Sequence, residues 1–385
     1  MKIIYVSSCI FRDTKNEKFI DYAASHVSEL FLRGINKAET IDCEVVNIEP
    51  ITPWPKNKKI SVKEEVCNIE GKSVLNIGFI NTFLVKQVSL RNSLAKALKN
   101  RVCKGDWILI YGLTTPRLIA ASKCAKLLGC KVAFIVPDLP NPQYMNPGGG
   151  ELYKTLKNLD VSIQRKYYKY VDKWILFSEK MSDFFKIDIT DCIVIEGMTD
   201  DIHEDQEEKG KDKDDFIVAY TGSVAFAYGL KELVDSVHKL DESIKLNIAG
   251  TGDAVDYVKK ISETDDRIQY VGALPHSEIY EFQRKASVLV NPRGNLEFTK
   301  YSFPSKTLEY MLAGIPVLMQ HLDGIPKEYD GYLNYYSKEK LGEEILEIYN
   351  NYDKYIDKAE KARLFVKEKK NYIYQTNKLI TFLKG

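Results

Sequence analysis

The chain has 385 residues, of which 44% are hydrophobic and 28% are charged, and its formal net charge at pH 7 is +1. This balance is typical of a soluble globular protein, and it excludes a disordered chain, a collagen and a simple coiled coil. At roughly 150 residues per domain, the length predicts two or three domains.

The ends and the cysteines indicate a cytoplasmic protein. No apolar run reaches the roughly 18 residues that a membrane span needs, and the start, MKIIYVSSCIFRD, lacks the length and the small-residue cleavage site of a signal peptide. The seven cysteines form no CxxC pair, and their number is odd, so we expect reduced thiols. The five histidines show no metal-ligand spacing, and we expect no metal site.

The charge is unevenly distributed along the chain. Residues 51–170 carry 20 Lys and Arg against 7 Asp and Glu, whereas the part after residue 200 is acidic. A basic first half suits an anionic lipid surface or a phosphate-bearing acceptor. A solvated lysine-rich surface explains the count equally well.

Short apolar, β-branched segments alternate with helical patterns through the first half, as in sheets that are buried on both faces. The strands expected there are Lys2–Ser8, Cys43–Ile48, Trp107–Gly112, Lys131–Asp138, Lys173–Ser178 and Cys192–Gly197. The unit WILIYG, RLIAASKCAKLLG, KVAFIVPD predicts a βαβ motif.

The charged stretch 198–215 lacks apolar periodicity and is either a linker or a surface loop. A second alternation follows it. The expected strands are Phe216–Thr221, Lys245–Gly250, Ile268–Gly272, Val288–Pro292 and Pro316–Met319, and the expected helices are GLKELVDSVHKL, AVDYVKKISE, HSEIYEFQRKA and SKTLEYMLAG. The tail, residues 338–385, is helical by composition.

Two consecutive βα arrays predict an α/β fold of two doubly wound, Rossmann-like parallel-sheet domains that face each other across a cleft. We expect an acceptor-binding domain over 1–197, a linker or loop over 198–215 and a nucleotide-sugar-binding domain over 216–365. Residues 366–385 are expected to form a helix that returns to the first domain.

The stretch 291–318 carries the most chemistry. A strand is expected to end near Pro292, and a helix to start near Pro304 and end at Gly314. Lys306 in the first helical turn is unfavourable for the helix itself and makes sense beside a bound anion. The carboxylate of Glu309, one turn later, can accept two hydroxyl hydrogen bonds. The alternative is a surface Lys–Glu pair worth a few tenths of a kcal/mol.

The pattern S-F-P-S-K-x-x-E-Y-M-x-x-G-x-P-V resembles the donor site of GT-B glycosyltransferases of the retaining family 4, also called glycosyl transferases group 1. YTGS at 220–223, IAGTGDAVDYV at 248–258 and IQYVGALP at 268–275 resemble further parts of the same domain. The glycine pair in AGTGDA fits a turn better than a dinucleotide fingerprint, because the third glycine is missing.

The resemblance implies roles for residues at matching positions. Glu309 would bind the ribose, the backbone of Gly222 and Ser223 the diphosphate, and the main chain at Leu274 the nucleobase. Lys306 and the amides of Ser305 and Thr307 would hold the phosphates, and Tyr301 and Phe303 would lie near the donor.

The sequence departs from the family pattern at three positions. Tyr301 stands where many relatives have a glutamate that touches the donor sugar. Ser223 and Tyr228 stand where many have an arginine and a lysine that hold the phosphates. We expect Arg293 and Lys306 to supply the positive charge that a diphosphate leaving group needs.

The expected strand over KVAFIVPD ends in Asp138, where the resemblance places an acidic residue or a histidine that faces the acceptor. Asp138 could take the proton of the acceptor hydroxyl, or it could form an Asx-turn ahead of two prolines. The loop 141–150 is either an acceptor loop or a connection. The segment VKQVSLRNSLAKALKNR, 85–101, predicts an amphipathic helix that lies on an anionic membrane or packs into the core.

The sequence therefore predicts a cytoplasmic glycosyltransferase, peripheral at the inner face of the membrane. The expected reaction moves a hexose from a UDP- or GDP-sugar to a hydroxyl of a lipid-linked glycan acceptor in cell-surface polysaccharide synthesis, with retention. We expect no cofactor, no metal and no nucleic-acid partner. The rival interpretations are a nucleotide-sugar epimerase or hydrolase, and a non-catalytic scaffold that has lost activity through the three departures.

Overall fold

A computed structural model describes the chain except for residues 11–21, 70, 84, 141–149, 201–215 and 241–242. The chain forms two compact units. Unit 1 comprises Met1–Met198 and Tyr372–Gly385, and unit 2 comprises Thr199–Asn371. Most of the expected linker, 198–215, lies outside the described residues.

Unit 1 is built on an eight-stranded sheet with the order β10-β9-β8-β7-β1-β2-β5-β4. All neighbouring strands are parallel except β4 and β5, which are antiparallel. The strands are β1 (Lys2–Ser7), β2 (Asp42–Asn47), β4 (Glu65–Ile69), β5 (Lys72–Asn76), β7 (Trp107–Tyr111), β8 (Lys131–Val136), β9 (Lys173–Leu176) and β10 (Cys192–Val194), and β3 (Ser61–Val62) pairs with β6 (Phe79–Ile80) in a separate ribbon.

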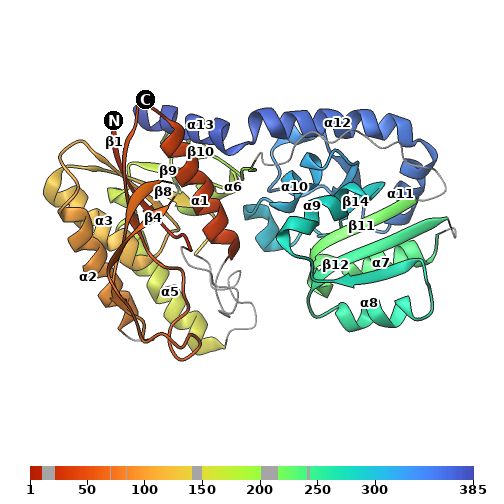
Figure 1. Cartoon of the computed structure of the whole chain (residues 1–385), viewed down its shortest axis with the longest axis horizontal. Helices are drawn as coiled ribbons and strands as arrows, with labels where there is room; N and C mark the ends of the chain where they lie inside the picture. The colour runs from red at the N-terminus through yellow and green to blue at the C-terminus, as the bar shows by residue number, and fades with distance from the viewer. Residues whose placement is uncertain (11–21, 70, 84, 141–149, 201–215, 241–242) are drawn as a thin grey trace. The chain divides into compact units, whose positions relative to one another are not determined.

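Helices cover both faces of this sheet because its central strands are apolar on both sides. The described helices of unit 1 are α1 (Tyr22–Lys37), α2 (Lys86–Lys99), α3 (Thr115–Leu128), α5 (Glu151–Arg165), α6 (Lys180–Phe185) and α13 (Tyr372–Lys384). Alternate strand residues such as Ile3, Tyr5 and Leu109 share one core with α1 and α13. Figure 1 shows α2 and α3 on the other side of the strands from α1, and α5 packs against α3.

Unit 2 contains a six-stranded, all-parallel sheet with the order β13-β12-β11-β14-β15-β16. The strands are β11 (Phe216–Ser223), β12 (Ile244–Thr251), β13 (Ile268–Gly272), β14 (Val288–Asn291), β15 (Val317–Gln320) and β16 (Asn334–Tyr336). The helices are α7 (Leu230–His238), α8 (Val255–Ser262), α9 (His276–Arg284), α10 (Lys306–Leu312), α11 (Leu341–Asn350) and α12 (Tyr352–Lys369).

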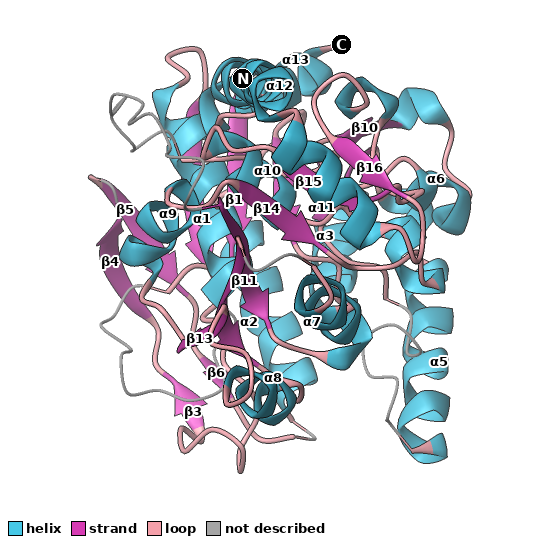
Figure 2. Cartoon of the chain, turned by 90° about the vertical axis from the view of Figure 1, so that its right-hand side faces the viewer, coloured by secondary structure: helices cyan, strands magenta, loops and turns pink. Residues whose placement is uncertain are grey.

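The core of unit 2 is divided by its sheet into two apolar layers. Val218 and Tyr220 face one layer, which α7, α8 and α11 complete, whereas Ala219 faces the other, which contains residues of α10 and α12. Figure 2 shows these strands with helices on both sides. The two Rossmann-like units confirm the predicted fold class.

The structure differs from the predicted elements in detail. Strands β3 to β6 and β16 were not expected, because they are short and lack a continuous apolar run. Strand β8 ends at Val136, two residues before the expected end at Asp138. The segment 85–101, predicted as an amphipathic helix that either lies on a membrane or packs into the core, forms α2, and its apolar side chains Leu90, Leu94 and Leu98 are buried.

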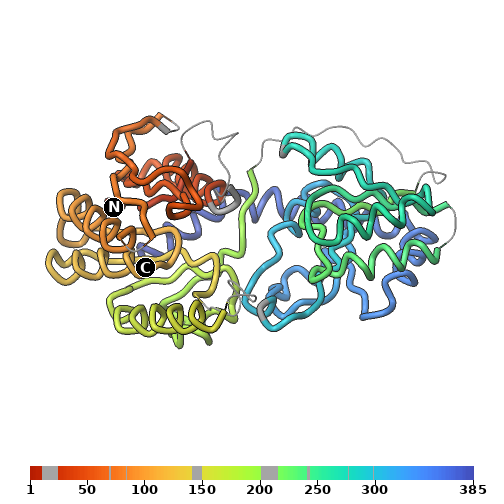
Figure 3. Tube along the Cα trace, turned by 90° about the horizontal axis from the view of Figure 1, so that it is seen from below, coloured from red at the N-terminus to blue at the C-terminus, as the bar shows by residue number. Residues whose placement is uncertain are grey.

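Both ends of the chain belong to unit 1, as the trace in Figure 3 shows. The amino terminus of Met1 donates to the Thr40 carbonyl at 3.4 Å, and Lys384 Nζ donates to Thr40 Oγ1 at 3.2 Å. Helix α13 packs against α1. The last fourteen residues are therefore a structural part of the first unit.

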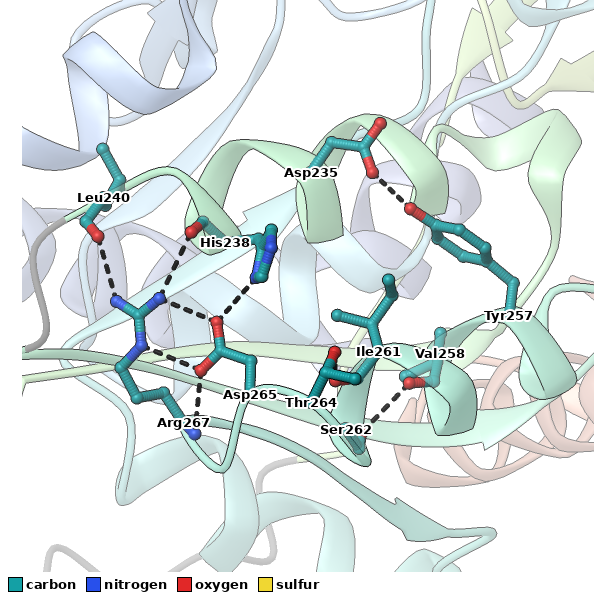
Figure 4. A network of polar contacts seen from close by, with 10 residues as sticks. All are labelled: Asp235, His238, Leu240, Tyr257, Val258, Ile261, Ser262, Thr264, Asp265 and Arg267. Carbon is teal, nitrogen blue, oxygen red and sulfur yellow. Dashed lines mark hydrogen bonds and ion pairs between the residues drawn. The ribbon is translucent and has the colours of Figure 1, made fainter.

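A buried ion pair fixes the turn between α8 and β13 in unit 2 (Figure 4). Arg267 donates to both oxygens of Asp265, at 2.9 and 2.7 Å, and to the carbonyls of Leu240 and His238 at 3.0 and 3.2 Å. His238 Nδ1 lies 2.8 Å from the same carboxylate. The bonds from Arg267 lower the pKa of Asp265 to about 2. This arginine has its counter-charge inside the protein.

Candidate nucleotide-sugar site in the second unit

The candidate site lies where the strand order of unit 2 reverses. The chain runs outward in one direction through β11, β12 and β13, and in the other through β14, β15 and β16. Loops after β11 and β14 diverge at this point and leave a crevice at the carboxyl ends of the strands, which is where open α/β sheets bind ligands.

A cavity of about 340 Å³ opens at this edge. Its walls are mostly small residues and main chain, which lets a ligand approach backbone amides closely. The lining residues are Thr221, Gly222, Ser223, Ala249, Gly250, Thr251, Ala273, Leu274 and Ile279. Three predicted donor-binding residues, Gly222, Ser223 and Leu274, are thus brought together from the end of β11 and the loop after β13.

Lys306 lies directly over Gly222. A Cβ atom built on Gly222 would come within 1.5 Å of Lys306 Nζ, and the φ angle of Gly222 is +127°. Only glycine suits both the backbone angle and the close approach. Lys306 is the first residue of α10, so the helix places an ammonium group against Gly222, a residue that lines the cavity.

The Lys306 ammonium is poorly compensated. It donates to Tyr220 Oη at 3.4 Å and lies 5.0 Å from the centre of the Tyr220 ring. Among the described residues no carboxylate comes within 4.0 Å of it. Burial, with a smaller contribution from Arg293, lowers the pKa of Lys306 to about 8, although Glu309 opposes the shift. Such a group gains from binding an anion.

Tyr310 holds α10 against the end of β11. Its hydroxyl accepts the Thr221 amide at 2.9 Å and donates to the Thr221 carbonyl at 3.2 Å. Gln283 Nε2 donates to Thr221 Oγ1 at 3.1 Å. Tyr310 is fully buried, and burial raises its pKa to about 12, so it remains a neutral donor and acceptor. This clamp fixes Lys306 relative to Gly222.

Arg293 supplies the second cation of the region. Its guanidinium lies 5.3 Å from the centre of the Tyr228 ring, and Nη2 donates to Ser302 Oγ at 3.3 Å. Tyr228 therefore supports an arginine from the loop after β14. Arg293 is close enough to Lys306 to lower its pKa.

The remaining predicted residues on and before α10 differ in exposure. Ser305 and Glu309 are exposed, and Tyr301 is half-buried. Phe303 is 8% exposed and packs 5.2 Å from the Tyr329 ring, as a core residue does. The predicted residues that remain accessible at the start of α10 are therefore Ser305, which precedes the helix, and Lys306 and Glu309 within it.

The structure places Thr307 differently from the expectation. Its side chain is fully buried, with Oγ1 3.9 Å from Met319 Sδ, and its amide already donates to the Pro304 carbonyl at 2.8 Å. Helix α10 has only seven residues. Positive charge at this point thus comes from Lys306 itself rather than from a row of free helix amides.

Asp138 belongs to unit 1. It is exposed and follows β8 at the carboxyl edge of the sheet. Residues 141–149 of the loop beyond it lie outside the described residues. In the described part of the chain no group of three His, Cys, Asp or Glu side chains is placed to hold a metal ion. None of the described helices is both long and apolar enough to cross a membrane.

Comparison with known proteins gives a family match to this part of the chain. The family model described as "Glycosyl transferases group 1" matches residues 201–365, which contain the whole cavity. Residues 201–365 belong to the glycosyl transferases group 1 family. Unit 2 is therefore a glycosyltransferase domain of the kind that takes nucleotide-sugar donors. No curated protein is significantly similar to the chain in sequence.

Solved structures match the whole chain at low identity. Anabaena Alr3699/HepE in complex with UDP is 13% identical, has a TM-score of 0.62 and matches over 100% of both chains. Sucrose-phosphate synthase from Thermosynechococcus elongatus is 12% identical with a TM-score of 0.66, over 100% of this chain and 98% of that one. The lipopolysaccharide outer core galactosyltransferase WaaB is 13% identical with a TM-score of 0.65, over 100% and 99%. At these identities the likeness shows the GT-B fold.

Tyr220 and Tyr310 are site residues that the sequence analysis missed. Both lie within motifs that were examined, YTGS and SKTLEYMLAG, but their aromatic rings fitted a core pattern. The signal that distinguishes them is the hydroxyl group, because a buried tyrosine usually finds a hydrogen-bond partner.

Proposed function

We propose that the chain transfers a hexose from a UDP- or GDP-sugar to a hydroxyl of a glycan acceptor, with retention at the anomeric carbon. The observation that carries the proposal is the half-buried Lys306, whose ammonium lies over Gly222, a residue that lines the cavity. A diphosphate that enters the cavity would give this ammonium its missing counter-charge.

Two cations stabilise the leaving group in this proposal. As the glycosidic bond breaks, negative charge grows on the diphosphate, and Lys306 with Arg293 lies ready to compensate it without reorganisation. The same two side chains make a metal ion unnecessary for charge compensation. Addition of a chelator should therefore leave the transfer rate unchanged, and loss of activity would contradict metal independence.

Glu309 is proposed to bind the ribose. It is exposed on α10 one turn after Lys306, and it acts electrostatically on that lysine. Its two oxygens can accept both ribose hydroxyls. Glu309→Ala should weaken nucleotide binding by about 1–3 kcal/mol. Equal affinity in calorimetry would remove Glu309 from the site.

The donor is tested directly by a calorimetric screen of UDP, GDP, ADP and their common sugar conjugates, first without metal and then with magnesium. Binding selective for one nucleoside diphosphate supports the proposal and identifies the base. Absence of binding by folded protein would favour a scaffold. Turnover of the donor without an added acceptor would favour a hydrolase or an epimerase.

Asp138 is proposed to act on the acceptor hydroxyl. The proposed same-face substitution has the leaving phosphate assist in removing the proton, and Asp138 orients the hydroxyl. Asp138→Asn should lower kcat with little effect on donor affinity. Normal turnover would leave Asp138 as a turn residue. The anomeric proton coupling of the product, measured by NMR, tests retention.

We also propose that unit 1 adsorbs to an anionic membrane at its inner face through α5, where a lipid-linked acceptor would be found. Leu152, Leu156 and Leu159 are 75%, 53% and 59% exposed and share one face of this helix. Lys154 and Lys157 flank this stripe. An exposed apolar stripe beside lysines is typical of helices that lie in a membrane interface.

Sedimentation with phosphatidylglycerol vesicles tests this surface. Leu156→Glu should reduce the bound fraction several-fold, because it places a charge in the apolar stripe. Leu127→Glu is the matched control, since Leu127 is 74% exposed on α3 outside the stripe. Equal loss in both variants, or no binding by the wild type, would refute membrane adsorption through α5.

A further inference from the structure

Unit 1 has its own point of strand reversal, between β1 and β7. The chain runs outward from β1 through β2 to β5, and from β7 through β8 to β10. Arg117 of α3 lies at this point. Its Nη1 donates to the carbonyls of Tyr111 and Gly112, at 2.5 and 3.3 Å, and its Nη2 donates to Ser8 Oγ. The guanidinium thus joins the ends of the two central strands.

Gly112 allows this arrangement. Its φ angle is +82°, and a Cβ atom built on it would lie 2.6 Å from Arg117 Nη1. Glycine at this position lets the guanidinium fold over the end of β7. Unit 2 shows the same relation between Gly222 and Lys306.

A second cation lies at the same edge of the sheet, against the loop that follows β2, the strand paired with β1. Lys86 is the first residue of α2, and its Nζ donates to the Ile51 carbonyl in the loop after β2 and lies 5.4 Å from the centre of the Phe79 ring. Burial, followed by repulsion from Arg117, lowers the pKa of Lys86 to about 8. Burial also lowers the pKa of Arg117 to about 10.

These two cations face neutral partners. In the described part of unit 1, no carboxylate comes within 4.0 Å of Lys86 Nζ or of the Arg117 guanidinium. Arg267 in unit 2, by contrast, is held by Asp265. Two neighbouring positive charges that are held only by carbonyls, a hydroxyl and a ring destabilise each other unless an anion joins them.

We propose that Lys86 and Arg117 form an anion-binding site at the point of strand reversal in unit 1 that takes a phosphate group of the acceptor. The proposal deepens the proposed function, since it gives the acceptor a chemical class. It rests on that function, because only a transferase has an acceptor. A phosphate offers oxygens to both side chains at once, which matches a planar guanidinium beside an ammonium.

The phosphate could belong to a water-soluble sugar phosphate or to a lipid-phosphate carrier. Two probes separate these sources: glucose 6-phosphate in calorimetry, and phosphatidylcholine vesicles that contain a polyprenyl phosphate in sedimentation. Both are added to full-length protein saturated with UDP, so that the anion site of unit 2 is filled. If UDP does not bind, the titrations use Lys306→Gln in place of saturation, and the site in unit 1 is still tested.

The decisive variant is Lys86→Gln, because Lys86 is half-buried at the start of a helix and its loss leaves the strand-joining bonds of Arg117 in place. We expect affinity for the phosphate probe to fall about tenfold or more, as loss of a charge-assisted hydrogen bond predicts. Lys96→Gln removes the same charge from an exposed position on α2 and should bind as the wild type does. Arg117→Lys, which keeps the charge, should weaken binding while the protein stays folded.

Binding of either probe that Lys86→Gln weakens and Lys96→Gln does not would support the site and identify the source. Binding of neither probe to folded wild-type protein would overturn it. Equal affinity of Lys86→Gln and wild type would also overturn it. Neither result depends on whether UDP binds, so failure of this site and failure of the donor site are distinguishable.

Discussion

Each unit places a cation over a glycine at the carboxyl edge of its sheet, and the units differ in which cation this is. Each starts a helix with a half-buried lysine, Lys86 on α2 and Lys306 on α10, and burial lowers the pKa of each to about 8. In unit 2 the lysine lies over a glycine at the wall of a cavity. In unit 1 an arginine lies over the glycine and the lysine lies at the same edge of the sheet.

The difference indicates what each unit is suited to bind. A lysine is a point charge on a flexible stem and can follow a diphosphate as its charge grows during bond breaking. An arginine tied to two strand ends is a fixed fork that suits a phosphate whose charge does not change during the reaction. In the two proposals, the reacting phosphate therefore binds to unit 2 and a positioning phosphate binds to unit 1.

The largest effect on UDP affinity should come from Gly222, and Gly112 is its counterpart in unit 1. Gly222→Ala forces the Lys306 ammonium away, since the new methyl would meet the flexible end of that side chain, and UDP affinity should fall about tenfold to a hundredfold. Gly112→Ala should displace Arg117 and leave UDP affinity unchanged. Calorimetry with UDP on both variants checks this. An equal loss in both would break the comparison between the units.

Removal of the Tyr310 hydroxyl should give the next largest effect. Tyr310→Phe leaves the buried amide and carbonyl of Thr221 without their partner, which should cost about 1–3 kcal/mol of unfolding free energy. Urea denaturation measures it. Tyr335→Phe is the control, because its hydroxyl bonds to the exposed Asp330 and its loss should cost less. Unchanged stability of Tyr310→Phe would show that α10 is held to β11 by packing alone.

The Asp265–Arg267 ion pair of unit 2 differs from Lys306 and Lys86, because its cation has a carboxylate partner. Because the pKa of Asp265 is lowered to about 2 from 3.8, its ionised form stabilises the folded state by about 2 kcal/mol above pH 4. That stability is lost as the pH falls from 3.8 through 2. Asp265→Asn should therefore be less stable by about this amount at pH 7, and its unfolding free energy should vary less with pH below 4.

Asp265→Asn should not affect UDP binding, because the pair lies at the turn between α8 and β13. Weaker UDP binding in the folded variant would contradict the separation of this structural pair from the site.

Ionisation of the two lysines should change the free energy of unfolding in the opposite direction to ionisation of Asp265. Their folded pKa values lie below the ordinary value of 10.5, so their charged forms destabilise the ligand-free protein below pH 8. This penalty fades as the pH rises from 8 to 10.5. Lys306→Met and Lys86→Met should each raise the unfolding free energy by about 1–2 kcal/mol at pH 7. Thermal denaturation across pH 7–10 checks it, and a loss of stability at pH 7 would show that the lysines hold the fold together.

The sequence analysis identified much of the fold because buried parallel strands have a strong local pattern. Ile268–Gly272 was predicted residue for residue, and Trp107–Gly112 to within one. Strands β3 and β6 escaped because two-residue ribbons have no pattern of their own. The segment before β7 was identified as a helix, but whether its apolar face meets a membrane or a core depends on α3, which no local pattern reveals.

Prediction of the site residues was limited in the same way, because local patterns do not show tertiary contacts. Lys306 was recognised because it stands in a motif with a helix start, and Gly222 because YTGS resembles part of the family's donor-binding domain. Thr307 and Phe303 belong to the same motif, yet their side chains turn into the core, since a helix presents only one face to a ligand. The sequence analysis did not identify Arg117 and Lys86 as site residues. They come to the same edge of the sheet only through loops that lie far apart in the sequence.

The central claim is that Lys306 is the anion-binding group of the donor site, and proton uptake on UDP binding tests it most directly. A bound diphosphate should raise the pKa of Lys306 from about 8, so binding at pH 8.5 should take up a large fraction of a proton. Calorimetry in buffers of different ionisation enthalpy measures that fraction. The account predicts uptake by the wild type, little uptake by Lys306→Met, and weaker binding by that variant. Equal uptake and equal affinity in both proteins would contradict it.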